Sequence, residues 1–341
     1  MAIFDYYGAT ALGKSISNMN CHQCGEIVTA GDRFCEECGA SLVTPNPHAI
    51  DNSCQKCGAP PSKIDAERYC IECGFRQVSR SNDPIELQPA PNLAGASDRG
   101  RRHHQNEDAI ALKFIEPDTY IIVVGDGVSS SQHPELASQA AVTACIEAVE
   151  LAIQQGIEPA TAICQGVDAA LIAVANIPID PTSDIDPSST TIVTAIVRDN
   201  IATIGWLGDS RAYWLALDKS LQLTQDDSWM RDAIESGFTP AEAAASPYAH
   251  AIVRWLGADT ADDGKPNLTT FAIPGAGYIL LCTDGLWNYA PDPNFLHDLI
   301  QQAPNDSRSI ARHLTQYANQ QGGQDNITVG ILITSDREII A

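Results

Sequence analysis

Four aspartates stand at the ends of apolar segments, and their placement points to metal chemistry. Asp126 follows YIIVVG, Asp209 follows IATIGWLG and Asp284 follows YILLCT, while Asp325 comes just before NITVGILI. A carboxylate at the end of a buried strand costs free energy unless a cation or strong hydrogen-bond donors compensate its charge. Turn chemistry explains any one Asp-Gly or Asp-Asn pair, but four together favour an acidic cleft. Hard, oxygen-liganded cations such as Mg²⁺ or Mn²⁺ are the natural occupants of such a cleft.

Eight of the eleven cysteines lie close together and form two repeats of paired C-x2-C-G motifs. Each repeat offers four thiolates, which suit one tetrahedral, structural Zn²⁺ ion. The predicted ligands are Cys21, Cys24, Cys35 and Cys38 for one ion, and Cys54, Cys57, Cys70 and Cys73 for the other. A unit of about two dozen residues buries too little apolar surface to fold alone, so zinc would supply its folding free energy. Iron would fit the same thiolates, and disulfides are disfavoured because no secretion signal starts the chain.

The composition restricts the partners. The 341 residues carry a formal net charge of −23, and such a surface repels nucleic acid and anionic lipid headgroups. The cysteine-rich segment 21–77 has five Lys/Arg against eight Asp/Glu, which favours docking or a structural role over nucleic-acid binding. The start, MAIFDYYGATALGKSIS, has no basic region followed by an apolar core, and no run reaches the roughly 18 apolar residues of a spanning helix. These features predict a cytoplasmic protein with neither a nucleic-acid nor a membrane partner.

Composition along the chain predicts a small N-terminal part and one larger globular domain. The expected segments are a flexible leader over 1–20, zinc ribbons over 21–43 and 54–77, a linker over 78–92 and a domain over 93–335. The linker prediction depends on VSRSNDPIELQPAPN, whose prolines and polar residues interrupt regular structure.

The elements that must position the aspartates are buried strands. Apolar runs rich in β-branched residues predict strands at 120–124, 191–197, 201–207, 278–282 and 327–333. Helical patterns are found at 134–155, 158–176 and 305–320. Because strands and helices fall in separate groups and do not alternate, we predict an α+β fold.

Seven motifs, in order, resemble those of the type 2C (PPM-type), metal-dependent protein serine/threonine phosphatases. They are SDRGRRHHQNEDA (97–109), VVGDG (123–127) with the later AS (137–138), STTIV (189–193), GDSRAY (208–213), LTQDDS (223–228), LLCTDGLW (280–287) and GGQDNITV (322–329). The resemblance covers about 93–335, and the cysteine repeats resemble double zinc ribbons. Together the two resemblances imply a four-layer α-β-β-α sandwich of two antiparallel sheets, preceded by the two small ribbons.

The resemblance also implies a reaction and a metal site. The reaction is hydrolysis of phosphoserine and phosphothreonine in proteins by water activated between two Mn²⁺ or Mg²⁺ ions. Asp126 would bridge the two ions, and the Gly127 carbonyl would hold one of them. Asp284 and Asp325 would complete the other.

Further oxygen ligands follow from the same resemblance. Glu107 and Asp108 would act through waters on the ions, and Asn326 would lie next to the metal cluster. Asp209 would join Asp284 at a third, weaker metal site known in bacterial members. The implied partners are phosphorylated proteins, in a signalling pathway with a cognate Ser/Thr kinase.

The sequence departs from the family pattern where the substrate phosphate is gripped. The family usually has an arginine five residues before the Asp of N-E-D, and this chain has His103 there. Arg101, Arg102 and His103 are therefore the candidates for phosphate binding. A histidine in this role would make phosphate binding weaker and pH-dependent.

A second departure precedes the family's variable flap, residues 229–256 here. Asp227 stands where the family usually has a histidine. Within the flap, Arg254 is the candidate substrate contact, whereas Trp255 suits either substrate contact or core packing.

Two other functions stay open beside the active phosphatase. A catalytically weak pseudophosphatase would keep the fold and bind phosphopeptides as a scaffold. The missing arginine supports it, while the retained Asp126, Asp284 and Asp325 argue against it. In the second alternative, the zinc ribbons carry the main function as a nucleic-acid or scaffold module, and their negative charge argues against nucleic acid.

Overall fold

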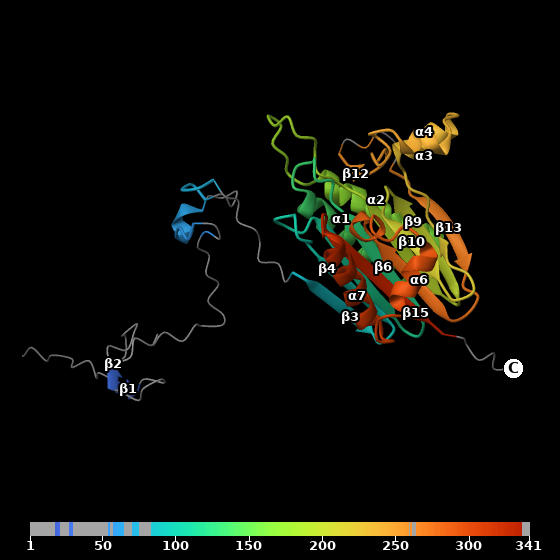
Figure 1. Cartoon of the computed structure of the whole chain (residues 1–341), viewed down its shortest axis with the longest axis horizontal. Coiled ribbons are helices and arrows are strands. Elements are labelled where there is room, and N and C mark those ends of the chain that lie inside the picture. The colour runs from blue at the N-terminus through green and yellow to red at the C-terminus, as the bar shows by residue number, and fades with distance from the viewer. Residues whose placement is uncertain are drawn as a thin grey trace, which may run out of the picture. The chain divides into compact units, whose positions relative to one another are not determined.

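The structure is a computed structural model that describes residues 18–20, 27–29, 54, 57–64, 70–74, 83–258, 260 and 264–335 (Figure 1). Its contacts divide the chain into two units, Met1–Gln77 and Val78–Ala341. The predicted ligands of the first zinc ribbon, Cys21, Cys24, Cys35 and Cys38, lie outside the described residues.

Among its described residues, the N-terminal unit contains two short strands and one turn of 3-10 helix. Strand β1 (Asn18–Asn20) pairs with β2 (Ile27–Thr29) in antiparallel fashion, so the predicted leader over 1–20 already contributes three residues to a hairpin. One turn of 3-10 helix, η1 (Pro61–Lys63), starts on prolines, which suit a first helical turn.

The larger unit contains two antiparallel sheets. The six-stranded sheet has the order β11 (Leu221–Gln222), β10 (Arg211–Leu215), β14 (Gly277–Cys282), β15 (Ile327–Thr334), β4 (Leu93–Asp98) and β3 (Ile85–Ala90). The five-stranded sheet has the order β13 (Asn267–Ala272), β9 (Ile201–Leu207), β8 (Ile192–Arg198), β6 (Thr119–Asp126) and β5 (Asp108–Ile115). The five runs predicted as strands all lie within these sheets.

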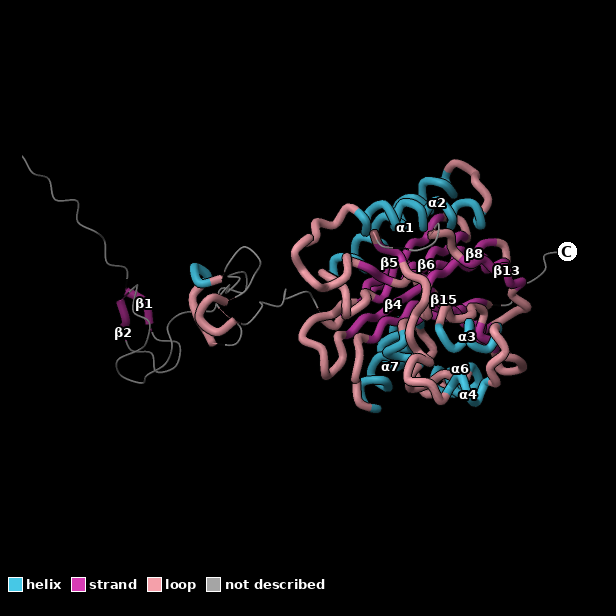
Figure 2. Tube along the Cα trace, turned by 90° about the horizontal axis from the view of Figure 1, so that it is seen from above, coloured by secondary structure: helices cyan, strands magenta, loops and turns pink. Residues whose placement is uncertain are grey.

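Helices cover the outer face of each sheet (Figure 2). On the five-stranded sheet lie α1 (Pro134–Gln154) and α2 (Pro159–Ala175), and on the six-stranded sheet lie α6 (Pro293–Ile300) and α7 (Ser307–Gln321). Among the described residues, α1 is the one helix long and apolar enough for a membrane span, but its buried face packs on β5, β6 and α2.

The core between the two sheets is apolar and closely filled. Its fully buried members include Leu93 and Ile279 from one sheet and Ile122, Val193 and Ile204 from the other. Burying one such side chain contributes about 1.5–3 kcal/mol. This core fixes the two sheets against each other and so fixes the strand ends that carry the aspartates.

The turn between β8 and β9 shows how the hairpins are closed. Asp199 and Asn200 both have positive φ, at 52° and 58°. Two central residues of this kind form the tight turn whose twist matches antiparallel strands, and Asp and Asn tolerate it better than most residues.

The predicted linker over 78–92 requires a correction. Residues 85–90 form the edge strand β3, which pairs with β4 through an irregularity between Leu87 and Ala90. Pro89 lies at this irregularity, and an edge strand tolerates proline because no partner needs its missing N–H. A bidentate ion pair from Arg312 of α7 to Glu86, at 2.6 and 2.7 Å, holds the strand to the helix layer.

Candidate active site

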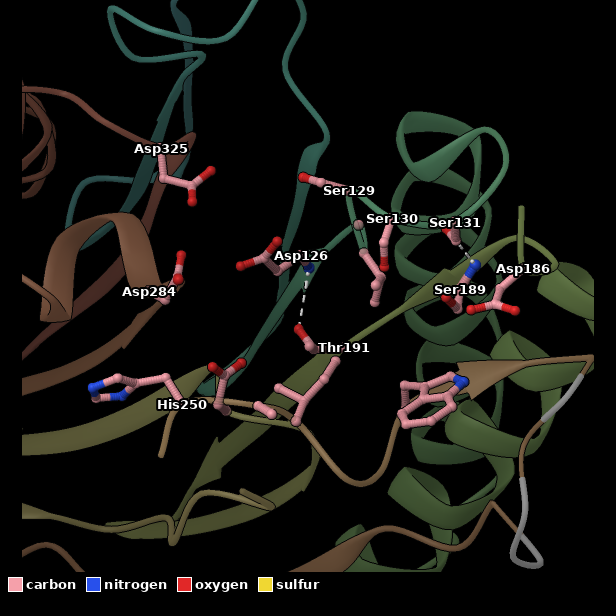
Figure 3. A pocket seen from close by; sticks show the side chains of 16 residues that line it. Asp126, Ser129, Ser130, Ser131, Asp186, Ser189, Thr191, His250, Asp284 and Asp325 are labelled. Atoms are coloured by element: carbon pink, nitrogen blue, oxygen red, sulfur yellow. Dashed lines mark hydrogen bonds between the residues drawn. The ribbon is translucent and has the colours of Figure 1, made fainter. Parts of the chain in front are cut away.

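Strand ends bring the predicted aspartates together at one edge of the sandwich. Asp126, the last residue of β6, lies directly opposite Asp108, the first residue of β5. Asp284 begins the short helix α5 (Asp284–Trp287) two residues after β14, and Asp325 lies two residues before β15. Figure 3 shows Asp126, Asp284 and Asp325 around a common space.

These aspartates line a cavity of about 470 Å³. Its described lining also contains Gly127, Val128, Ser129, Ser130, Ser131, Asp186, Ser189, Thr191, Asp209, His250, Ala251, Ile252 and Trp255. No lysine or arginine is among these lining residues. An anionic substrate therefore needs cations in the cavity, because the titratable side chains of the described walls are carboxylates and one histidine.

Burial and mutual repulsion raise the pKa values of the carboxyl groups. Burial, followed by the charge of Asp284, raises the pKa of Asp209 to about 8. Burial, followed by the charge of Asp325, raises the pKa of Asp284 to about 6. For Asp126 and Asp108, burial together with the surrounding carboxylates raises the pKa well above its ordinary value. The raised pKa values show that negative charge is unfavourable at these carboxyl groups, and divalent cations would compensate it.

Asp108 provides a direct test of whether the residues fit a cation. Its Oδ2 accepts a hydrogen bond from Thr283 at 2.9 Å, and Thr283 in turn accepts one from the Thr328 amide at 3.0 Å. Its Oδ1 is buried and has no hydrogen-bond partner among the described residues. A buried carboxylate oxygen without a donor is costly, so this side chain fits a site completed by a hydrated cation.

Gly127 follows Asp126 where two other backbones come close. A Cβ at this position would collide with the carbonyl oxygens of Pro134 and Glu107. The Gly127 amide donates to the Glu107 carbonyl at 3.1 Å, and Ser129 donates to the Glu107 carboxylate. This packing holds the loop after β6 against the start of β5.

Asn326 holds the loop that leads into β5. Its Oδ1 accepts from the Glu107 amide at 2.7 Å. Its Nδ2 donates to the carbonyls of Arg99, at 2.8 Å, and Gln105, at 3.1 Å. This buried amide therefore positions Glu107 and Asp108 relative to Asp325, its neighbour in the chain.

The phosphate-binding candidates do not line the cavity. Arg101 and Arg102 are exposed on the loop before β5. His103 Nε2 lies 3.3 Å from the Asp325 carboxylate. The histidine at the family's arginine position thus faces a predicted metal ligand.

Arg254 also points elsewhere than predicted. Its guanidinium lies 3.5 Å from the Asp227 carboxylate and donates to the Lys265 carbonyl at 2.7 Å. Asp227 is 2% exposed and accepts further hydrogen bonds from Asn267 at 3.0 Å and from Arg231 at 3.2 Å. This carboxylate anchors the flap, which contains α3 (Trp229–Glu235) and α4 (Pro240–Ala244).

The second predicted zinc site lies in the N-terminal unit. The sulfur atoms of Cys54, Cys57, Cys70 and Cys73 all lie within 4.8 Å of one another. Two of the sulfur pairs are 3.6 Å apart. Four sulfurs at this spacing suit the tetrahedral coordination of zinc.

Three features of the site have no counterpart in the sequence-based prediction. Thr283 and Thr328 hold Asp108 from behind the cavity lining. The lining itself includes Asp186 and the flap residue His250, whose ring is centred 6.4 Å from the Trp287 ring. The threonines lie inside recognised motifs. Asp186 and His250 lie in loops without a motif, and only the fold brings them to the cavity.

Comparisons with known proteins agree with this architecture. The family model of protein phosphatase 2C matches residues 95–327, and that of the double zinc ribbon matches residues 21–74. The serine/threonine phosphatase stp of Listeria innocua is 31% identical over 241 residues, which cover 68% of this chain and 92% of the relative.

Two solved structures extend the comparison. The Mycobacterium tuberculosis serine/threonine phosphatase PstP/Ppp has 27% identity and a TM-score of 0.57, over 72% of this chain and 98% of that one. A second structure, of the PstP catalytic domain in complex with two manganese ions, has 27% identity and a TM-score of 0.53 over the same shares.

The sandwich and its carboxylate-lined cavity define the class of metal-dependent phosphatases. Within that class, the chain belongs to the protein phosphatase 2C family and is a protein serine/threonine phosphatase. The predicted four-layer α-β-β-α sandwich and the predicted family are both confirmed.

Proposed function

We propose that the chain hydrolyses phosphoserine and phosphothreonine in proteins at the aspartate-lined cavity, in a reaction that requires Mn²⁺ or Mg²⁺. One observation carries the proposal. Asp126, Asp209, Asp284 and Asp325 line one cavity, and no described lysine or arginine shares that lining. The substrate phosphate and the carboxylates repel each other until divalent cations lie between them.

The family resemblance and the shared cavity support an assignment of the residues that would hold the ions. Asp126 would be a ligand of both ions, with the Gly127 carbonyl as a further ligand. Asp284 and Asp325 would complete one ion site. The more deeply buried Asp209 would share a third, weaker site with Asp284.

The bound ions would supply an activated water for in-line attack on phosphorus and would neutralise the phosphoryl oxygens. The chain's own contribution is positioning. Asn326 fixes the loop that carries Glu107 and Asp108, and the unpartnered Oδ1 of Asp108 would accept a hydrogen bond from water held by the ions. Thr191 accepts a hydrogen bond from the Asp126 amide at 3.3 Å, which fixes the end of β6 against the neighbouring loop.

The test is hydrolysis of a phosphothreonine peptide by the full chain in EDTA, Mg²⁺ and Mn²⁺, beside the variant Asp284→Asn. We expect turnover with Mn²⁺, none in EDTA and a loss in the variant. Asp184→Asn is the matched control, because Asp184 is exposed and does not line the cavity. If the chain is inactive with every metal but binds the phosphopeptide, the proposal of an active phosphatase is wrong and that of a phosphopeptide-binding scaffold takes its place.

We further propose that the N-terminal ribbons bind two structural zinc ions and dock the phosphatase on other proteins. The sulfur cluster of Cys54, Cys57, Cys70 and Cys73 supports the metal, and the acidic balance of 21–77 favours protein over nucleic acid. Elemental analysis should find two zinc ions per chain. One zinc ion, or iron in its place, would overturn this part of the proposal.

The cellular setting is proposed on the same basis. The chain would oppose a cognate Ser/Thr kinase in the cytoplasm, acting on phosphorylated proteins. Deleting its gene should raise phosphothreonine on soluble cytoplasmic proteins in a quantitative phosphoproteome. An unchanged phosphoproteome would contradict this setting without affecting the catalytic proposal.

A further inference from the structure

The cavity continues beyond the aspartate cluster toward a second wall. Figure 3 shows Asp186 and Ser189 on the opposite side from Asp284 and Asp325, with Ser130 between the two groups. The same cavity includes Ile252 and the half-buried Trp255. A phosphorylated side chain at the aspartates would therefore leave a neighbouring side chain of the substrate near this second wall.

Hydrogen bonds fix the loop that carries Asp186. The Asp186 carbonyl accepts from the Gln132 amide at 2.9 Å. The Gln132 side chain donates to the Ile185 carbonyl at 2.9 Å and accepts from the Asp180 amide at 2.8 Å. Ser131 forms a bridge with Asp186, and its hydroxyl accepts from the Ser189 amide at 3.2 Å. The backbone of Asp186 is thus tied to the loop that follows Gly127.

The flap side of this wall is fixed through a short sheet. Strand β12 (Leu256–Gly257) pairs with β7 (Ser189–Thr190), and Trp255, which directly precedes β12, lines the cavity. The Trp255 carbonyl accepts from the Thr260 hydroxyl at 3.0 Å. The Trp255 ring and the Ile252 side chain give the cavity apolar surface in addition to its carboxylates.

The charge at this wall is uncompensated within the described structure. The Asp186 side chain is exposed, and no described residue forms an ion pair or hydrogen bond with its carboxylate. A carboxylate and an indole that line the same cavity suit a lysine or arginine, whose charged end pairs with the acid while its stem covers the ring.

We propose that Asp186 and Trp255 form a specificity pocket for a lysine or arginine of the substrate close in sequence to its phosphorylated residue. The inference rests on the proposed phosphatase function and adds the substrate class, which is basic phosphoprotein segments. Asp186 acts as counter-ion, and Trp255 packs on the stem of the basic side chain.

The test compares kcat/KM for matched phosphothreonine peptides flanked by lysine, norleucine or glutamate. In the full chain we expect lysine to be favoured over norleucine by about tenfold, the joint effect of an exposed ion pair and a cation–π contact. Asp186→Asn should remove most of this preference, and Asp186→Lys should reverse it toward glutamate. The ratio between peptides within one variant is unaffected by partial loss of folded enzyme.

Two controls separate this pocket from other causes. Asp184→Lys makes the same change of charge two residues away, outside the cavity lining, and should keep the preference for lysine. Equal effects of Asp184→Lys and Asp186→Lys would overturn the pocket and assign the preference to the chain's net charge. An Asp186→Lys variant that still favours lysine, or a parent enzyme that shows no preference, would also overturn it.

The small substrate p-nitrophenyl phosphate separates the pocket from the proposed function itself. It carries no side chain for the second wall, so the parent enzyme with Mn²⁺ should hydrolyse it whether or not the pocket exists. Turnover of this substrate without peptide preference defeats the specificity pocket alone. Absence of turnover defeats the phosphatase proposal, and the pocket with it.

Discussion

The thiolate cluster and the carboxylate cluster are two metal-type sites built in opposite ways. Cys54, Cys57, Cys70 and Cys73 come from two turns less than twenty residues apart, and a unit of about two dozen residues buries little apolar surface. The carboxylates of Asp126 and Asp325 come from distant parts of the chain and meet because two packed sheets bring them together. In the first case the metal would make the fold, whereas in the second the fold makes the metal site. Removing metal should therefore unfold one region and only inactivate the other.

The largest expected effect comes from removing a carboxylate. Asp126→Asn should lower kcat/KM toward a phosphothreonine peptide by at least about 100-fold. Mutation of residues that only support a metal ligand already lowers metal affinity or activity by about 10–100-fold. The metal-free variant should melt no lower than the parent chain, since the change removes charge repulsion. The activity assay checks the fall in kcat/KM, and calorimetry checks the melting temperature. A large drop in melting temperature would mean that the carboxylate stabilises the fold itself.

Removing zinc should unfold the N-terminal cysteine unit and leave the catalytic activity of the larger domain intact. In zinc-finger peptides the metal supplies about 10–16 kcal/mol, so a strong chelator should unfold the cysteine unit and expose Lys63 to trypsin. The fragment from β3 onward should stay resistant and should regain activity when Mn²⁺ is added. Cys70→Ser should reproduce the cleavage without a chelator. If trypsin does not cleave at Lys63 in zinc-free protein, the cysteine unit folds without its metal, and the proposed difference between the two sites is wrong.

A smaller effect should follow from the amide that positions the active-site loop. Asn326→Ala removes the hydrogen bonds to Glu107, Arg99 and Gln105 and should lower kcat by roughly 10-fold or more. Asn305→Ala, on the exposed surface away from the cavity, is the matched control. An unchanged kcat in Asn326→Ala would show that the loop needs no support from this side chain.

The smallest effect is a pH dependence of the metal-free domain. Folding raises the pKa of Asp209 to about 8 and that of Asp284 to about 6, so between pH 4 and 8 the folded state binds more protons than the unfolded state. The free energy of unfolding should then fall as pH rises through this range. We expect the melting temperature in EDTA to be a few degrees lower at pH 8 than at pH 5.5, at about 2–4 °C per kcal/mol.

Added Mn²⁺ should cancel this trend, because the cations replace the protons of the carboxyl groups. Asp209→Asn should flatten the pH dependence and stabilise the metal-free domain at pH 8. A melting temperature that rises with pH in EDTA would contradict the raised pKa values.

The same contrast explains what the sequence could predict. The apolar runs of β6, β8, β9, β14 and β15 predicted strands of both sheets, because buried strands are rich in apolar and β-branched residues. Strand β3 was missed because Pro89 resembles a linker residue, and its pairing depends on β4. The flap helices α3 and α4 are short and belong to a segment without a motif.

The candidate site divides along the same line. The aspartates follow from their places at strand ends, but the partners of the predicted phosphate and substrate contacts do not. Arg254 turns to the buried Asp227, and His103 lies against Asp325, because tertiary packing decides where a flexible side chain finds an opposite charge. Asp186 could not be predicted, since its position depends on hydrogen bonds to Gln132, more than fifty residues earlier.

Strand β15 has a consequence for synthesis of the enzyme. It lies between β14 and β4 in the six-stranded sheet, and Asp325 and Asn326 directly precede it. The ribosome makes these residues after every other element of the domain. We expect the growing chain to hold an open sheet and an incomplete active site until β15 leaves the exit tunnel. A ribosome-bound chain with β15 still inside should hydrolyse no phosphopeptide, so newly made enzyme could not act before β15 has emerged.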